Sequence, residues 1–329
     1  MKVNQFQINP LTDYPNEMNL ISLGVGGDNQ SFQFIINQLT KFKRFSKSEI
    51  IIGYGHKLFE EIKDLEYGIT TELTFYKFRK PKFGEILTTG SKLKYSKFFS
   101  TSLFDAAIII WIRDESKFDL SITTEKLYNY LKALSGVKVL NVVNGFKDQS
   151  KKNLMGFEDG TSNIDQYDDR IFAIENKPLK KDSWMAGGTY LVSILFSIDL
   201  SKWELLACET QEKIIGRKKE SNELLEEIEN SHVSLNRKHK YPPSDRRSLR
   251  IFRQGYNLAY FDKGKYITGL SFNSFQESPY RTFETLSSGQ WLGGKVFGGD
   301  DEKMSEIISV IDSGVFAIPP LSIFNFNNH

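Results

Sequence analysis

The chain has 329 residues, 40% of them hydrophobic and 26% charged, a composition typical of a soluble globular protein. Its net charge of +2 and short basic runs do not indicate nucleic acid or an anionic membrane as a partner. It lacks a run of about 18 apolar residues that could span a bilayer, an apolar signal segment and a twin arginine, which favours a cytoplasmic protein. The single cysteine, Cys208, excludes an intramolecular disulfide and a zinc site of several thiolates, and we expect it buried on a helix face.

The first half of the chain has the periodicity of alternating strands and helices. Short apolar, β-rich runs alternate with segments whose apolar residues recur at helical spacing. In chain order we expect strand 19–27, helix 28–42, strand 48–55, strand 105–114, helix 122–136 and strand 137–146. This order predicts one βαββαβ unit.

The second half repeats the same order of elements without a residue-level repeat. A polar, lysine-rich stretch at 147–155 separates the two halves. Beyond it we expect strand 187–199, helix 201–217, strands 248–262 and 265–276, helix 302–314 and strand 315–320. The sequence therefore predicts a duplicated α+β layout, with halves at residues 1–150 and 151–329.

The chain contains four histidines, and one of them is placed differently from the rest. His329 is the last residue, His239 lies in a basic loop-like segment, and His56 follows the glycines of GYGHKLF. His232 lies in SHVSLN, directly after an acidic segment predicted to be helical. A metal ligand and an ordinary structural histidine both remain open for His232 on local sequence alone.

Two further residues could carry chemistry. Asp159 lies between glycines in GFEDGTSN (156–163), where tight backbone geometry could project the carboxylate into a cavity or simply form an Asp-Gly turn. Arg253, in RIFRQGYN, lies on a predicted strand. An inward arginine there would need an anionic partner, whereas an outward one would need none.

The order of these segments changes their interpretation. GFEDGTSN, then SHVSLN, then RIFRQGYN, resemble the dye-decolourising peroxidase family, whose best-known motif is GFxDGT. GLSFNSFQ (269–276) and SGVFAIPP (313–320) are similar to that family's closing strands, and the C-terminal segment is most similar to the deferrochelatase-like branch. The resemblance covers nearly the whole chain and is strongest after residue 150.

This resemblance implies a fold, a cofactor and roles for residues. The fold would be α+β, with two ferredoxin-like (βαββαβ) halves whose antiparallel sheets face each other. One haem b would lie in the second half, with His232 as the proximal iron ligand and Asp159 and Arg253 on the distal side. Gly160 and Phe275 would contribute to the haem site. Glu306 would be either the acidic partner of His232 or a solvent-facing helix residue.

The implied reaction is the oxidation of aromatic or dye-like donors by hydrogen peroxide in one-electron steps. Asp159 would move a proton and Arg253 would stabilise developing negative charge. The alternative is a haem-binding or iron-handling protein for haem storage, delivery or deferrochelation with little turnover, and a haem-free relative is a third reading. The Asp159–Arg253 pair favours the peroxidase. Self-association into a homo-oligomer stays open, and Gly255 stands where some subgroups of the family have asparagine.

Overall fold

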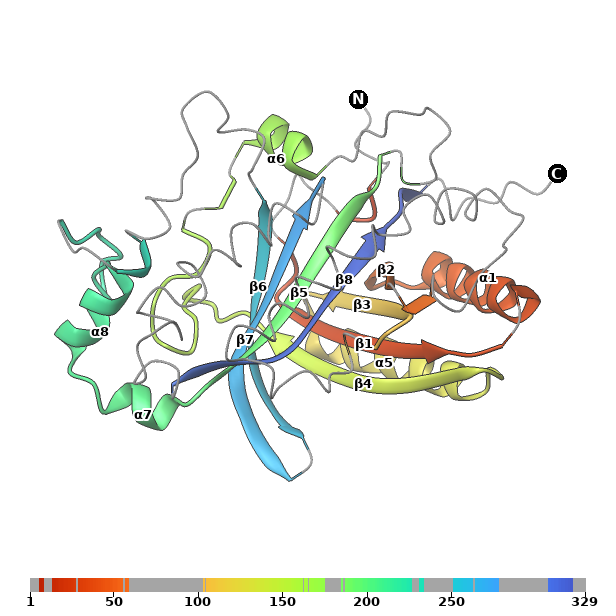
Figure 1. Ribbon diagram of the computed structural model, residues 1–329, viewed down its shortest axis with the longest axis horizontal. Coiled ribbons are helices and arrows are strands. Elements are labelled where there is room, and N and C mark those ends of the chain that lie inside the picture. Colours follow the sequence, from red (N-terminus) through yellow and green to blue (C-terminus); the bar gives the residue numbers. More distant parts are fainter. Residues whose placement is uncertain are drawn as a thin grey trace.

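The computed structural model is built around eight antiparallel strands with helices outside them (Figure 1). Every strand pairing within the described residues is antiparallel, which confirms the α+β class expected from the sequence. The described residues are 6–8, 14–27, 29–55, 57–58, 103, 105–161, 163–164, 166–174, 185, 187–226, 231–233, 251–262, 264–277 and 307–321.

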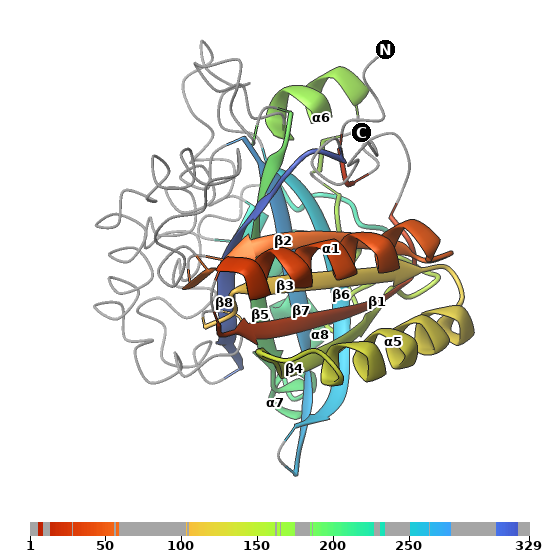
Figure 2. The same ribbon diagram turned by 90° about the vertical axis from the view of Figure 1, so that its right-hand side faces the viewer.

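Strands of the first half form a quartet in the order β4-β1-β3-β2. Two helices cover one face of this quartet (Figure 2), and buried leucines and isoleucines fill the space between helices and strands. The second helix begins where Ser116 Oγ accepts a hydrogen bond of 3.2 Å from the N–H of Asp119. The elements are β1 (Glu17–Val25), α1 (Asn29–Phe45), β2 (Glu49–Gly55), β3 (Ile108–Asp114), α5 (Lys117–Lys132) and β4 (Val137–Phe146).

Strands of the second half form a quartet in the order β6-β7-β5-β8. Short helices lie beside this quartet, and Figure 1 shows two of them, α7 and α8, at the opposite side of the molecule from α1. The elements are α6 (Tyr167–Ile174), β5 (Thr189–Ile198), α7 (Leu200–Glu204), α8 (Cys208–Ile215), β6 (Phe252–Asp262), β7 (Lys265–Gln276) and β8 (Ile308–Ile318). None of the helices in the described part of the chain is both long enough and apolar enough to cross a membrane.

Two short pairings join the quartets into a closed ring. β2 pairs with β8 through Tyr54 and Gly55, and β4 pairs with β6 through Gly145 and Phe146. Large side chains fill the interior of the ring, each 2% exposed or less: Trp111, Leu191, Phe252, Tyr256, Phe275 and Phe316. The interior of the ring is therefore a packed core.

Three expectations about local structure are wrong. The helix expected over 201–217 is divided into α7 and α8. The helix expected over 302–314 is wrong from residue 308, where β8 begins, while residues 302–306 lie outside the described residues. Cys208 begins α8 and is exposed rather than buried.

A β-bulge explains the error at β8. Leu195 pairs with Asp312 and the next residue of β5, Phe196, pairs with Val310, so Ile311 is an extra residue in β8. The bulge interrupts the two-residue alternation of a strand, and Ile307, Ile308 and Ile311 then recur at helical spacing.

Candidate functional site

The outer face of β6 carries Arg253. Side chains alternate along this strand: Phe252, Gln254 and Tyr256 are at most 2% exposed and point into the ring, whereas Arg253 and Gly255 lie on the opposite face and keep some accessible surface. The candidate site therefore lies on the outside of the second quartet, and its inner side is supported by the packed core.

The loop that follows β4 holds Asp159 against this face. Asp159 donates its backbone N–H to the carbonyl of Lys151 at 2.9 Å, which folds the loop back on itself. Asn257, two residues after Gly255 on β6, accepts a bond from the N–H of Leu154 at 3.0 Å and donates to the carbonyl of Lys152 at 3.1 Å. These bonds fasten the loop to the strand that carries Arg253.

The carboxylate of Asp159 lies over the backbone of Gly255. A β-carbon added at Gly255 would come within 2.3 Å of Asp159 Oδ2, closer than any side chain allows. Arg253 lies two residues earlier on the same face, and the charges of its guanidinium and of the carboxylate influence each other. Burial lowers the pKa of Arg253, and the negative charge of Asp159 acts in the opposite direction.

Asn163 ties the same motif to the backbone of Arg253. Its Nδ2 donates to the carbonyl of Arg253 at 2.7 Å, and its Oδ1 accepts the N–H of Arg253 at 3.0 Å. GFEDGTSN therefore contacts β6 at two successive positions of one face, with Asn163 at Arg253 and Asp159 at Gly255.

His232 lies beyond α8. Ser231, directly before it, packs against Gly216 at the C-cap of α8, where φ is +90° and an added β-carbon would lie 2.5 Å from Ser231 Oγ. Burial lowers the pKa of His232 to about 4, and the positive charge of Arg253 lowers it as well. The imidazole is therefore neutral near pH 7, the form that coordinates metals, and it lies within electrostatic range of Arg253.

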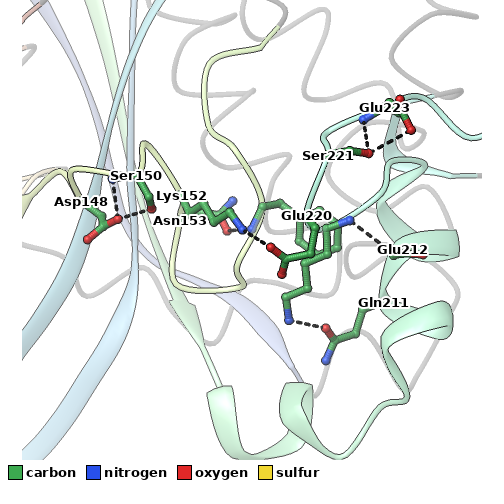
Figure 3. Close-up of polar contacts among 11 residues, drawn as sticks. Asp148, Ser150, Lys152, Asn153, Gln211, Glu212, Glu220, Ser221 and Glu223 are labelled. Atoms are coloured by element: carbon green, nitrogen blue, oxygen red, sulfur yellow. Dashed lines mark hydrogen bonds and ion pairs between the residues drawn. The ribbon is translucent and has the colours of Figure 1, made fainter.

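The loop after β4 and the turn after α8 are packed together (Figure 3). Lys152 Nζ lies 3.4 Å from a Glu220 oxygen, and Lys219 Nζ donates to Gln211 Oε1 at 2.7 Å. The stem of Lys219 crosses Gly156, whose φ is +87° and where an added β-carbon would lie 2.3 Å from Lys219 Cε. The exposed ion pair itself contributes little to stability.

The other three residues expected at the haem site are Gly160, Phe275 and Glu306. Gly160 is exposed, with φ at +79° and open space around it, and its N–H donates to Asp159 Oδ1 at 2.8 Å. Phe275 was expected near the cofactor, but it faces the ring interior, stacked on Trp111 at 5.8 Å between centroids. An aromatic residue of β7 that does lie on the Arg253 face near Gly255 is Phe272, which pairs with Gly255. Glu306 lies outside the described residues.

Two residues at the site were not anticipated. Asn163 belongs to the motif already singled out, so the signal for it was present. Tyr14 hydrogen-bonds to both backbone groups of Gly255, at 3.0 and 3.1 Å, across 241 residues of sequence. It carries no motif, and only the folded chain reveals its position.

The second half of the chain, which carries the candidate site, matches a known protein family. Residues 150–323 match the family model described as "Dyp-type peroxidase, C-terminal". A dye-decolorizing peroxidase of Mycolicibacterium paratuberculosis is 27% identical over 223 residues, which cover 66% of this chain and 59% of that protein. One from Brevibacterium linens is 35% identical over 105 residues, covering 30% and 27%. The chain thus spans less than two thirds of these curated relatives.

Solved structures show the same fold at low sequence identity. The encapsulated DyP-type peroxidase from Mycobacterium smegmatis aligns with a TM-score of 0.72 at 18% identity, covering 99% of both chains. A variant of DypB from Rhodococcus jostii RHA1, solved in complex with heme, aligns with a TM-score of 0.67 at 20% identity, covering 98% of both. At these identities the structural similarity concerns the fold.

Proposed function

Because this chain belongs to the Dyp-type peroxidase family, we propose that it is a haem-dependent peroxidase that uses hydrogen peroxide to oxidise aromatic or dye-like donors. His232 would hold the iron of one haem b, and Asp159 and Arg253 would act on the peroxide. The curated relatives of similar sequence are dye-decolorizing peroxidases, and a protein of the same fold has been solved with heme.

The observation that carries the proposal is the convergence of these three residues. Asp159 lies over Gly255 beside Arg253, and the charge of Arg253 lowers the pKa of His232. They come from three separate parts of the chain, and each remains partly accessible to solvent although Arg253 and His232 are strongly desolvated.

The donor set fits haem better than a metal ion bound by protein ligands alone. Within the described part of the chain, no group of three or more His, Cys, Asp or Glu side chains could hold a metal ion. The site offers one neutral imidazole, that of His232, and a single histidine is a common way for peroxidases to hold haem iron. When bound, haem would supply redox-active iron, and hydrogen peroxide would supply the two oxidising equivalents that the donors consume.

The residues of the chain would move the proton and stabilise the charge. Heterolysis of the O–O bond requires a proton to pass from one peroxide oxygen to the other, and the Asp159 carboxylate can accept it and return it. Arg253 is always cationic and would stabilise negative charge developing on the departing oxygen. A carrier that only stores, delivers or strips haem needs neither residue, so the Asp159–Arg253 pair favours the peroxidase.

We also propose that residues 1–150 and 151–329 are two ferredoxin-like halves, with the haem in the second. In each quartet the spatial order is the fourth, first, third and second strand of that half. This order is the one expected of a βαββαβ unit. The three proposed site residues all fall in the second half.

A hemin titration tests the assignment of His232. Purified protein should bind hemin with a stoichiometry of about one and give a Soret band, and His232→Ala should lower the affinity or change the band. The matched controls are His56→Ala and His239→Ala, which should behave like the parent. Normal hemin binding and spectra in His232→Ala would contradict the assignment.

A further inference from the structure

We propose that Tyr14 is a positioning residue of the peroxide site, because its hydroxyl holds the backbone of Gly255 where Asp159 lies beside Arg253. Tyr14 precedes β1 and belongs to the first half of the chain, whereas the other proposed site residues belong to the second. The inference rests on the proposed function, and its test is chosen so that the two can fail separately.

The hydroxyl of Tyr14 occupies the place of a neighbouring strand. Tyr14 Oη accepts the N–H of Gly255 at 3.0 Å and donates to the carbonyl of Gly255 at 3.1 Å. β4 pairs with β6 only at Asn257 and Leu258, so the edge of β6 before Asn257 is not paired with that strand. Tyr14 therefore provides hydrogen-bond partners for the backbone N–H and C=O of Gly255, as Asn163 does for those of Arg253.

The edge of β6 at Gly255 must be held in position because the Asp159 carboxylate lies against it. Gly255 has no side chain to pack, and a glycine inside a strand weakens the strand locally. The Asp159 carboxylate lies so close to Gly255 that not even a β-carbon would fit between them. A displacement of the Gly255 backbone would therefore change the separation between Asp159 and Arg253.

Tyr14 is itself held in place before any ligand binds. Its ring packs edge-on against Tyr256, with 5.3 Å between centroids, and Lys147 Nζ lies 4.2 Å from its ring centroid. Lys147 Nζ also donates to the carbonyl of Tyr14 at 3.0 Å, and Tyr256 Oη donates to the carbonyl of Pro15 at 2.9 Å. These contacts together hold the Tyr14 hydroxyl against Gly255.

Electrostatics keep the Tyr14 hydroxyl protonated, as a simultaneous donor and acceptor must be. Burial raises the pKa of Tyr14 well above its usual value, and the charge of Asp159 raises it further, while the Gly255 hydrogen bond and the charge of Arg253 act in the opposite direction. The phenol therefore lies within the field of both charged site residues while remaining neutral.

The test uses Tyr14→Phe, which removes only the hydroxyl and keeps the ring contacts with Tyr256 and Lys147. With hemin bound, we expect a stopped-flow reaction with hydrogen peroxide at least about tenfold slower, since small displacements of catalytic groups have such effects, and a hemin affinity within about twofold of the parent. In an Asp159→Asn background, Tyr14→Phe should cause no further loss, because it acts through Asp159. The matched control is Tyr130→Phe, whose hydroxyl donates to Gln38 away from the site.

Hydrogen exchange of the haem-free protein provides a readout that is independent of activity. The segment 252–257 should exchange faster in Tyr14→Phe than in the parent and Tyr130→Phe, because the Gly255 N–H loses its acceptor. An unchanged exchange, a peroxide rate within about twofold of the parent, or additive losses with Asp159→Asn would each overturn the proposal. If the parent itself does not react with peroxide, the proposed function fails, and hydrogen exchange alone decides whether Tyr14 fixes β6.

Discussion

The Asp159 carboxylate occupies the space that a side chain at Gly255 would need. The distance from an added β-carbon at Gly255 to Asp159 Oδ2 would be only 2.3 Å, and Arg253 lies two residues before Gly255 on the same face of β6. Gly255 stands where some subgroups of the family have asparagine. The absence of a side chain at this position is what allows the Asp159 carboxylate to approach the strand. The position of the Asp159 carboxylate in the proposed peroxide site therefore requires a glycine at 255.

Replacing Gly255 with alanine should displace Asp159. We expect Gly255→Ala to keep hemin binding but to react with hydrogen peroxide at least about tenfold more slowly, because misplacing a catalytic group by about 1 Å can cost a hundredfold. Stopped-flow absorbance measures this rate. The matched control is Gly26→Ala, where an added β-carbon meets no atom within 4 Å. Equal rates for Gly255→Ala and the parent would show that Asp159 does not act from this position.

Replacing Gly216 with alanine should displace Ser231 and, with it, the adjacent His232. Gly216 ends α8 at φ +90°, and an added β-carbon would lie 2.5 Å from Ser231 Oγ. We expect the free energy of unfolding to fall by about 1 kcal/mol or more, from the left-handed backbone alone, and the affinity for hemin to fall as well. Urea unfolding and hemin titration measure the two effects. A loss of stability with unchanged hemin affinity would separate Gly216 from the placement of His232.

We expect Arg253 to stabilise charge rather than to hold the fold. Removing one such group typically costs about 10²–10³ in rate, so Arg253→Leu should bind hemin yet react slowly with peroxide. Arg253→Lys keeps the charge but not the planar fork and should retain part of the rate. Single-turnover kinetics compare the three proteins. Rates within about twofold of one another would place the guanidinium away from the peroxide.

The sequence predicted the elements more reliably than the directions of their side chains. Strand periodicity located β6 and β7, but whether Phe275 or Phe272 faces the site depends on which face packs against Trp111 from the other half of the chain. The sequence of the segment 269–276 alone does not indicate which of its two faces packs against Trp111. The bulge at Ile311 could not be predicted for the same reason, because it depends on the pairing of β8 with another segment, β5. The sequence of β8 alone shows only apolar residues at helical spacing.

Resemblance singled out the three candidate site residues but not the contacts that hold them. His232, Asp159 and Arg253 each have an ordinary local interpretation, and only their order along the chain distinguished them. Tyr14 has no such signal, since its role arises from one pair of hydrogen bonds across the two halves of the molecule. Gly255 was noted only as a departure from the family pattern, because its function requires Asp159 to lie on top of it.

Lys43 should make stability depend on pH. Burial lowers its pKa to about 8, with Glu49 acting against this change and Arg113 reinforcing it, while its ammonium donates to the carbonyl of Ile50. The folded state then binds fewer protons than the unfolded state between pH 8 and the usual lysine value of about 10.4, so this residue makes stability rise with pH in that window.

Lys43→Met should remove that dependence. The slope contributed by one proton is at most about 1.4 kcal/mol per pH unit, and the difference between parent and variant isolates it from other titrating groups. Urea unfolding at several pH values between about 7 and 10 provides the measurement. Lys41→Met, which replaces an exposed lysine of the same helix, should keep the parent's slope. Identical slopes in the parent and Lys43→Met would show that the Lys43 ammonium is not desolvated.

The reaction of hemin-loaded protein with hydrogen peroxide tests the proposed peroxidase most directly. Absorbance is followed after mixing with peroxide, alone and with an aromatic dye, for the parent and for Asp159→Asn. We expect a rapid spectral change and bleaching of the dye in the parent, and an Asp159→Asn variant that keeps its Soret band but loses most of both reactions. A parent that binds hemin yet reacts no faster than free hemin, or a variant that matches the parent, would contradict a peroxidase that acts through Asp159.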